Sequence, residues 1–195
     1  MSTAYPPSTG EYEQLLAAAT RLFAELGYDQ TETEMVAGAA GLPASSITKE
    51  FGGKRQLYLE VFRRVHASEL ALVRKFQEAG FDRDRYHEFL DLYFDYLLEH
   101  PENAALMVQR WMNDAADLRE IEKTFVLPQA GRMRDATKDV FRPEVDGELM
   151  AWTVAWAIQI FVLNGIPGHD EAKDPEDTAR FRRHLHHLAD MYLKP

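Results

Sequence analysis

Hydrophobic and polar residues are spaced along this chain with the period of α-helices. Between residues 11 and 26 the apolar positions follow the i, i+3, i+4, i+7 rule and stop at Gly27, a residue type that commonly ends helices. Similar stripes recur later, through "YHEFLDLYFDYLLEH", "ENAALMVQRWMNDAADL", "GELMAWTVAWAIQIFVLNG" and "PEDTARFRRHLHHLADMYL". No hairpin turn between alternating runs and no internal repeat is found. The pattern predicts an all-α protein.

Two short helices are predicted between residues 31 and 51. Thr31 stands three residues before Glu34, the spacing of a capping box, in which each side chain bonds a free amide at the start of a helix. The second short helix follows a proline, and its Ile47 and Phe51 share one face. A pair of glycines ends that helix, and a longer one begins directly afterwards.

The second short helix can be interpreted as a DNA-recognition helix. A helix of about two turns buries too little surface to be stable alone, so neighbouring helices must brace it. A short helix set across a preceding one by a glycine-containing turn is the helix-turn-helix, whose second helix enters the major groove. A surface helix in an ordinary bundle is the plainer alternative. On the DNA-binding interpretation we expect groove contacts from Ala44, Ser45, Ser46, Thr48 and Lys49, and backbone positioning by Tyr28, Thr31 and Lys54.

The same segment resembles a known family. "LLAAATRLFAELGYDQTETEMVAGAAGLPASSITKEFGGKRQLYLEVF" is similar to the N-terminal domain of the tetracycline-repressor (TetR) family of bacterial regulators, through Ala18, Phe23, Gly27, Tyr28, Thr31, Val36, Ala37, Ala40, Gly41, Phe51, Lys54 and Leu57. The resemblance implies a homodimeric, ligand-responsive regulator, with the role of a repressor expected. It also implies a disordered tail at 1–10, a helix-turn-helix domain at 11–57 and a helical ligand-binding and dimerisation domain at 58–195.

Four positions depart from the family pattern. Thr48 stands where the family commonly has a tyrosine that touches phosphate, and Glu50 where a histidine or another aromatic residue is common. Family members often carry arginine or lysine just before the first helix, whereas this chain carries Glu11 and Glu13. Up to Val65 the sequence contains six basic and eight acidic side chains. The alternative is therefore a regulator-like fold with reduced DNA binding that acts as a protein-partner or small-molecule binding module.

Composition narrows the function further. The net charge of −10 argues against a general affinity for nucleic acid, so any DNA contact is expected to be local. Without cysteine there is neither a disulfide nor a thiolate zinc site, which fits a cytoplasmic protein. The first ten residues do not form a signal peptide, and "MAWTVAWAIQIFVLNGI" is interpreted as a buried helix, so no membrane association is expected. No nucleophile elbow or phosphate loop is present, and we expect no enzyme.

The C-terminal two thirds offer candidates for an effector site and a dimer interface. Most aromatic residues at helical spacing should be core, but a cavity for a small, largely apolar effector is hypothesised with a lining of Tyr93, Met107, Arg110, Trp111 and Trp156. The apolar stripe of the last helix predicts dimer contacts by Phe181, Leu185, Leu188 and Tyr192. Trp152 of the preceding helix is predicted to join them. His184 and His187 lie one turn apart, but two ligands do not make a metal site, and neither a metal nor a cofactor is expected.

Overall fold

A computed structural model describes residues 10–169 and 174–195, and within them the regular structure is helical. Gly10 already belongs to the first helix, and the remainder of the tail expected at 1–10 lies outside the described residues. The elements are α1 (Gly10–Leu26), α2 (Thr33–Ala39), α3 (Ser45–Phe51), α4 (Lys54–Ala79), α5 (Arg83–Glu99), α6 (Pro101–Trp111), η1 (Glu122–Val126), α7 (Leu127–Thr137), α8 (Gly147–Asn164) and α9 (Pro175–Tyr192).

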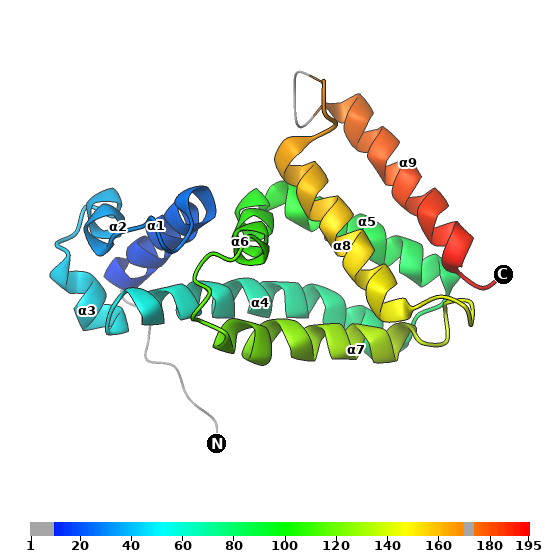
Figure 1. Cartoon of the computed structure of the whole chain (residues 1–195), viewed down its shortest axis with the longest axis horizontal. Helices are drawn as coiled ribbons and strands as arrows, with labels where there is room; N and C mark the ends of the chain where they lie inside the picture. Colours follow the sequence, from blue (N-terminus) through cyan, green and yellow to red (C-terminus); the bar gives the residue numbers. More distant parts are fainter. Residues whose placement is uncertain (1–9, 170–173) are drawn as a thin grey trace.

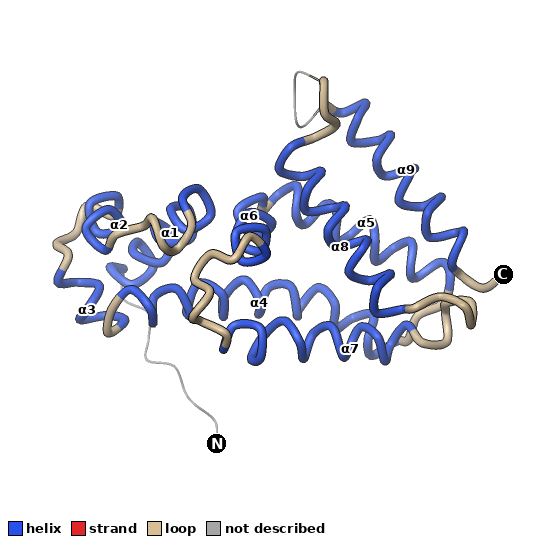
Figure 2. Tube along the Cα trace, in the orientation of Figure 1, coloured by secondary structure: helices blue, strands red, loops and turns tan. Residues whose placement is uncertain are grey.

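The helices form an elongated molecule in which α1, α2 and α3 gather at one end (Figure 1). Helix α4 starts beside them and runs along the length of the molecule next to α7, whereas α5, α8 and α9 make up the other end. Helix α6 packs on both α1 and α8, so it joins the two ends (Figure 2). The domain boundary expected between residues 57 and 58 falls inside α4.

The first core holds α1 to α3 against the beginning of α4. The apolar stripe predicted for residues 11–26 packs here, although its last member, Leu26, is 40% exposed. The predicted inward pair of α3 also packs here: Ile47 is buried, and the ring of Phe51 stacks on Tyr12 with 4.6 Å between centroids. Burial of these side chains is what makes a two-turn helix stable.

The predicted capping box at residues 31–34 is wrong. Thr31 is completely buried, and its hydroxyl donates to the carbonyl oxygen of Gly27 at 2.6 Å. Helix α2 begins only at Thr33, and its N-cap residue Glu32 makes no side-chain capping bond. The hydroxyl of Thr31 closes the turn after α1, so it is not available to the free amides of α2.

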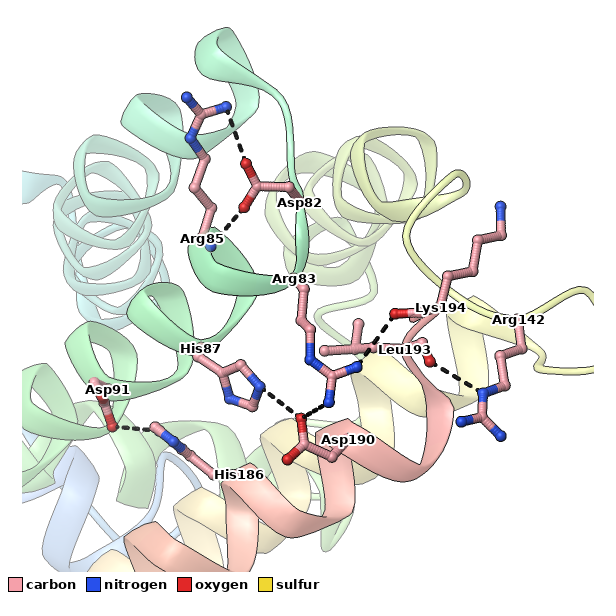
Figure 3. Close-up of polar contacts among 10 residues, drawn as sticks. All are labelled: Asp82, Arg83, Arg85, His87, Asp91, Arg142, His186, Asp190, Leu193 and Lys194. Carbon is pink, nitrogen blue, oxygen red and sulfur yellow. Dashed lines mark hydrogen bonds and ion pairs between the residues drawn. The ribbon is translucent and has the colours of Figure 1, made fainter.

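Polar contacts fix α9 to α5, as Figure 3 shows. Asp190 on α9 accepts a hydrogen bond from Arg83 at 2.6 Å and lies 2.9 Å from Nε2 of His87. One turn earlier on α9, Nε2 of His186 lies 2.9 Å from the carboxylate of Asp91. These pairs hold the last helix in a single register on the body of the chain.

A π-helical segment, η1, leads directly into α7. Pro128 lies at this junction, in the first turn of α7, where its missing amide proton costs no helical hydrogen bond. The irregular segment places Phe125 and Val126 against the interior cavity described below.

Candidate nucleic-acid interface and internal cavity

Helix α3 presents a small polar face at one end of the molecule. Ala44, Ser45, Thr48 and Lys49 are exposed, as expected for groove contacts. Ser46 is only 6% exposed and lies beside Ile47 in the inward-facing part of the helix, so its hydroxyl does not belong to this face. In the first turn of this seven-residue helix some side chains point outward and others inward, and Ser46 is one that packs inward.

Two residues expected to position the DNA backbone do reach the surface nearby. The ammonium of Lys54, at the start of α4, lies over the ring of Tyr28 at 4.4 Å from its centroid, a cation–π contact. Burial and the charge of Asp117 raise the pKa of the Tyr28 hydroxyl, which keeps it protonated and able to donate a hydrogen bond. Thr31 is not on this surface, because it is buried and bonded to backbone carbonyls.

Carboxylates surround the basic side chains of this region. Lys49 lies 3.2 Å from Glu11 and 3.0 Å from Glu50, and both interactions raise the pKa of Lys49, with Glu50 contributing more. Further back, Arg64 pairs with Glu13. All of these pairs involve partly or largely exposed side chains, and such pairs contribute little to folding stability.

A polar seam joins the α1–α2 turn to the segment that follows α6. The carboxylate of Asp114 accepts hydrogen bonds from the backbone amides of Tyr28 at 2.7 Å and Asp29 at 3.0 Å. The hydroxyl of Tyr58 donates to the same carboxylate at 3.3 Å. A second contact crosses this seam, since Arg55 pairs with Glu120 at 2.6 Å. Residues distant in sequence therefore hold the proposed DNA-binding helices in place.

Arg110 supports this seam and does not line the cavity. Its guanidinium donates to the carbonyl oxygens of Asp114 and Ala115 at 2.5 and 2.6 Å and pairs with Glu122. The two carbonyls belong to a turn in which Asn113 and Ala115 both have positive φ, a conformation that side-chain-bearing residues rarely adopt. The arginine thus stabilises a strained turn that aims Asp114 at the α1–α2 turn.

An internal cavity of about 150 Å³ lies among α4, α5, α7 and α8. Of the five residues expected to line it, Tyr93 and Met107 do so, whereas Arg110, Trp111 and Trp156 do not. Most of the wall is aromatic or aliphatic, contributed for example by Phe62, Phe89 and Phe125. Helices α1, α2 and α3 contribute no residue to it.

Two polar residues of the cavity were absent from the predicted lining. Glu69 of α4 lies on the wall, and Gln159 of α8 is 3% exposed with its side-chain amide donating to the hydroxyl of Tyr93 at 3.2 Å. A signal for the first was present: Glu69 stands four residues after Val65 and four before Val73, within the buried stripe of the helix. A charged residue at a core position of a helix is a candidate for a ligand contact.

The tryptophans occupy different places from those expected. Trp152, predicted for the dimer interface, lines the cavity and stacks on Trp156 with 6.0 Å between ring centroids. Trp156, predicted for the cavity, is 44% exposed and also meets Trp111 at the surface. The two residues of α8 are one turn apart, and periodicity alone does not tell which side of an all-apolar helix faces inward.

The apolar stripe of α9 packs within the chain. Phe181 stacks on Phe161 of α8 with 4.0 Å between ring centroids, and Leu185 is buried. Tyr192 packs against the same core, and Leu188 is partly buried. Phe181, Leu185 and Tyr192 therefore attach α9 to its own domain, and the dimer contacts predicted for this stripe stay a prediction.

The outer face of α8 carries apolar side chains instead. Leu149, Trp156 and Ile160 are 59%, 44% and 47% exposed and recur with helical spacing, and Met191 of α9 is 61% exposed. By length and composition α8 could also cross a membrane, a test that core helices of soluble proteins pass as well, and a third of its residues are buried. Among the residues described, no group of three or more histidine, aspartate or glutamate side chains is placed to hold a metal ion.

Comparison with known proteins adds independent findings. Residues 15–61 match the family model described as "Bacterial regulatory proteins, tetR family". Among solved structures, the ketosteroid transcriptional regulator KstR2 of Mycobacterium tuberculosis is 19% identical, with a TM-score of 0.72 over 100% of both chains. The fatty acid degradation regulator FadR from Bacillus halodurans is also 19% identical, with a TM-score of 0.67 over 94% of this chain and 96% of that one.

A TetR family transcription regulator from Marinobacter aquaeolei VT8 is 19% identical as well, with a TM-score of 0.69 over 95% of this chain and 96% of that one. No match was found among curated proteins. At these identities the likeness establishes the fold over the full length, and the match to the family model covers residues 15–61.

Proposed function

We propose that this chain belongs to the tetR family of bacterial regulatory proteins, whose model it matches over residues 15–61, and that it is a ligand-responsive transcriptional repressor that acts as a homodimer in the cytoplasm. The observation that supports the proposal is the exposed polar face of α3. Ile47 fixes the helix in the first core, while Ser45, Thr48 and Lys49 point outward on a segment of the size that fits a major groove.

Groove contacts are assigned to Ala44, Ser45, Thr48 and Lys49, and contacts with the DNA backbone to Tyr28 and Lys54. Small residues at the start of α3 permit close approach, and its hydroxyls can donate to or accept from bases or phosphates. Ser46 and Thr31 are left out of this assignment because both are buried.

The acidic surroundings of Lys49 limit the affinity without preventing binding. Lys49 is itself largely exposed in its pairs with Glu11 and Glu50, so a phosphate can replace a carboxylate as its partner. The carboxylates stay nearby and repel the backbone, and salt weakens the remaining attraction. Binding should therefore be restricted to a short site and should be strongly salt-dependent.

The outer face of α8 is the proposed dimer surface, within a ligand-binding and dimerisation domain that follows residue 57. Leu149, Trp156 and Ile160 form an exposed apolar strip that a second copy would cover. A two-fold dimer would place two α3 helices in successive major grooves of a near-palindromic operator. Ile160→Glu should yield monomers in sedimentation velocity, whereas Leu127→Glu, an equally drastic change at an exposed position of α7, should leave the dimer intact.

The seam at Asp114 would couple the effector cavity to the DNA-binding helices. Met107 lines the cavity from α6, and Arg110, one turn later, holds the turn that carries Asp114. A ligand that moves α6 would therefore move the acceptor of the Tyr28 and Asp29 amides, and with it the orientation of α3. The effector acts by binding one arrangement of the two α3 helices more tightly than another.

Selection of genomic DNA fragments by the purified protein, at low and at physiological salt, tests the proposal. We expect recovery of a palindromic sequence that Lys49→Ala no longer selects, whereas Lys54→Ala weakens binding to all sequences. Lys138→Ala, which removes the same charge from an exposed site at the end of α7, is the control.

The second candidate function, a partner-binding or small-molecule module without DNA binding, is favoured by the carboxylates that pair with Lys49, Arg55 and Arg64. Failure of a folded dimer to enrich any sequence at either salt, with and without candidate effectors, would support this second function and contradict the first.

A further inference from the structure

The cavity is small, mostly apolar and closed on several sides by aromatic rings. Its volume of about 150 Å³ matches that of an engineered apolar cavity known to bind benzene. A single ring with a short side chain is therefore the size of ligand that it accepts without expansion. Such a wall binds by apolar burial, so the few polar groups decide the chemistry of the ligand.

Two hydrogen-bond acceptors are among those polar groups. The side-chain oxygen of Gln159 is buried and has no hydrogen-bond partner among the described residues, while its amide nitrogen is bonded to Tyr93. Glu69 faces the same cavity, and burial raises the pKa of its carboxyl to about 7. The negative charge of Glu69 also contributes to the raised pKa of Tyr93, so the three residues form one polar group of side chains.

No positive charge balances Glu69 on the wall. Lysine and arginine do not occur among the residues found to line the cavity. His66 does line it, but burial and the nearby charge of Arg132 lower its pKa, so the imidazole is mostly neutral near pH 7. A buried carboxyl and an unpaired amide oxygen, with no cation beside them, disfavour an anionic ligand and favour one that brings its own donors.

We propose that the effector is an organic amine, with a ring or short apolar body among the aromatic side chains and its ammonium group between Glu69 and the side-chain oxygen of Gln159. The proposal rests on the proposed function, in which an effector occupies this cavity, and it adds the chemical class of that effector. Binding of the cation would favour the ionised form of Glu69, because opposite charges in a poorly solvated site attract strongly.

Three probes of matched size test the class: 2-phenylethylamine, 2-phenylethanol and phenylacetate. Isothermal titration calorimetry on the full-length protein without DNA should rank their affinities in that order. Glu69→Gln should weaken amine binding tenfold or more, change alcohol binding little and improve phenylacetate binding. Near pH 7 the amine should release protons from the wild type, because Glu69 loses its proton, and should release none from the variant.

Glu78→Gln is the matched control, because Glu78 also lies on α4 but is exposed and is not among the residues found to line the cavity. Its amine affinity should equal that of the wild type. The proposal is overturned if the amine does not bind at millimolar concentration, if phenylacetate binds as tightly, or if Glu78→Gln rather than a folded Glu69→Gln loses the preference. Because no DNA is present, these outcomes are independent of the fragment selection that tests the proposed function.

Discussion

The two ends of this molecule bury their residues differently. Around α1 to α3 the core is closed: Leu15, Phe23 and Ile47 are at most 1% exposed, and the buried Thr31 hydroxyl is hydrogen-bonded. Around α5, α7 and α8 the aromatic residues enclose a cavity into which an unpaired Gln159 oxygen and a carboxyl project. A helix that reads DNA must keep one shape, whereas a sensor needs space and unsatisfied groups that a ligand completes.

The same truncation should cost more at the first end than at the second. Phe23→Ala removes a fully buried ring from the closed core and should lower the free energy of unfolding by about 3–5 kcal/mol. Phe125→Ala removes a half-buried ring beside an existing cavity and should cost below about 2 kcal/mol. Urea denaturation measures both, and equal losses would contradict the difference in packing.

Asp114→Asn should damage the seam between the two ends. The side chain keeps its size, but only one of its two atoms can still accept from the Tyr28 and Asp29 amides, which should cost about 1–3 kcal/mol. Hydrogen exchange at these two amides should accelerate. Asp117→Asn, an exposed change of the same charge, is the control and should leave both stability and exchange unaltered.

Glu69→Gln should stabilise the protein in a pH-dependent way. The pKa of Glu69 is about 7 in the folded state, above its ordinary value of 4.5, so the folded state binds more protons between these values. Wild-type stability therefore falls as pH rises from 4.5 through 7, and the variant avoids this loss. Its advantage should be absent at pH 4 and reach on the order of 2 kcal/mol above pH 8.

Thermal and urea unfolding from pH 4 to 8.5 would measure that advantage. Glu78→Gln, an exposed change on the same helix, should show no such rise. A Glu69→Gln advantage that is already complete at pH 4 would mean that packing, and not ionisation, is responsible.

Glu11→Gln should have the smallest effect, on DNA affinity alone. Removing one carboxylate from Lys49 should strengthen binding to the selected DNA by about threefold to tenfold at low salt, and less at high salt. Glu25→Gln changes the net charge equally at an exposed position in the second half of α1 and should have less effect. Equal effects of the two changes would show that total charge, and not the Lys49 pair, sets the affinity.

Sequence patterns predicted the closed end better than the open one. Periodicity predicted the helical type of the chain, the inward position of Ile47 and the outward positions of Thr48 and Lys49. It succeeded because each helix at this end has one apolar side, which packs into one core. The failures near this end concern polar residues that satisfy local backbone groups. Thr31 was expected at a helix cap but closes the preceding turn instead.

At the open end, periodicity did not predict which residues face inward, because α8 is apolar on most of its circumference. Trp152 lines the cavity although it was expected at a dimer interface, and Trp156 is 44% exposed although it was expected in the cavity. Arg110 could not be assigned, because its partners belong to an irregular turn with positive φ at Asn113 and Ala115. The cavity is formed by helices distant in sequence. The signal for it in the sequence was Glu69, a charged residue within an apolar stripe.

The central claim is that the open end controls the closed one, and its most direct test is the affinity of the selected operator with and without saturating 2-phenylethylamine. Fluorescence anisotropy at fixed salt should show the ligand changing the operator affinity of the wild type by about five- to a hundredfold, and changing that of Asp114→Asn far less. An unchanged operator affinity in a wild type that calorimetry shows to be loaded with the amine would contradict the claim.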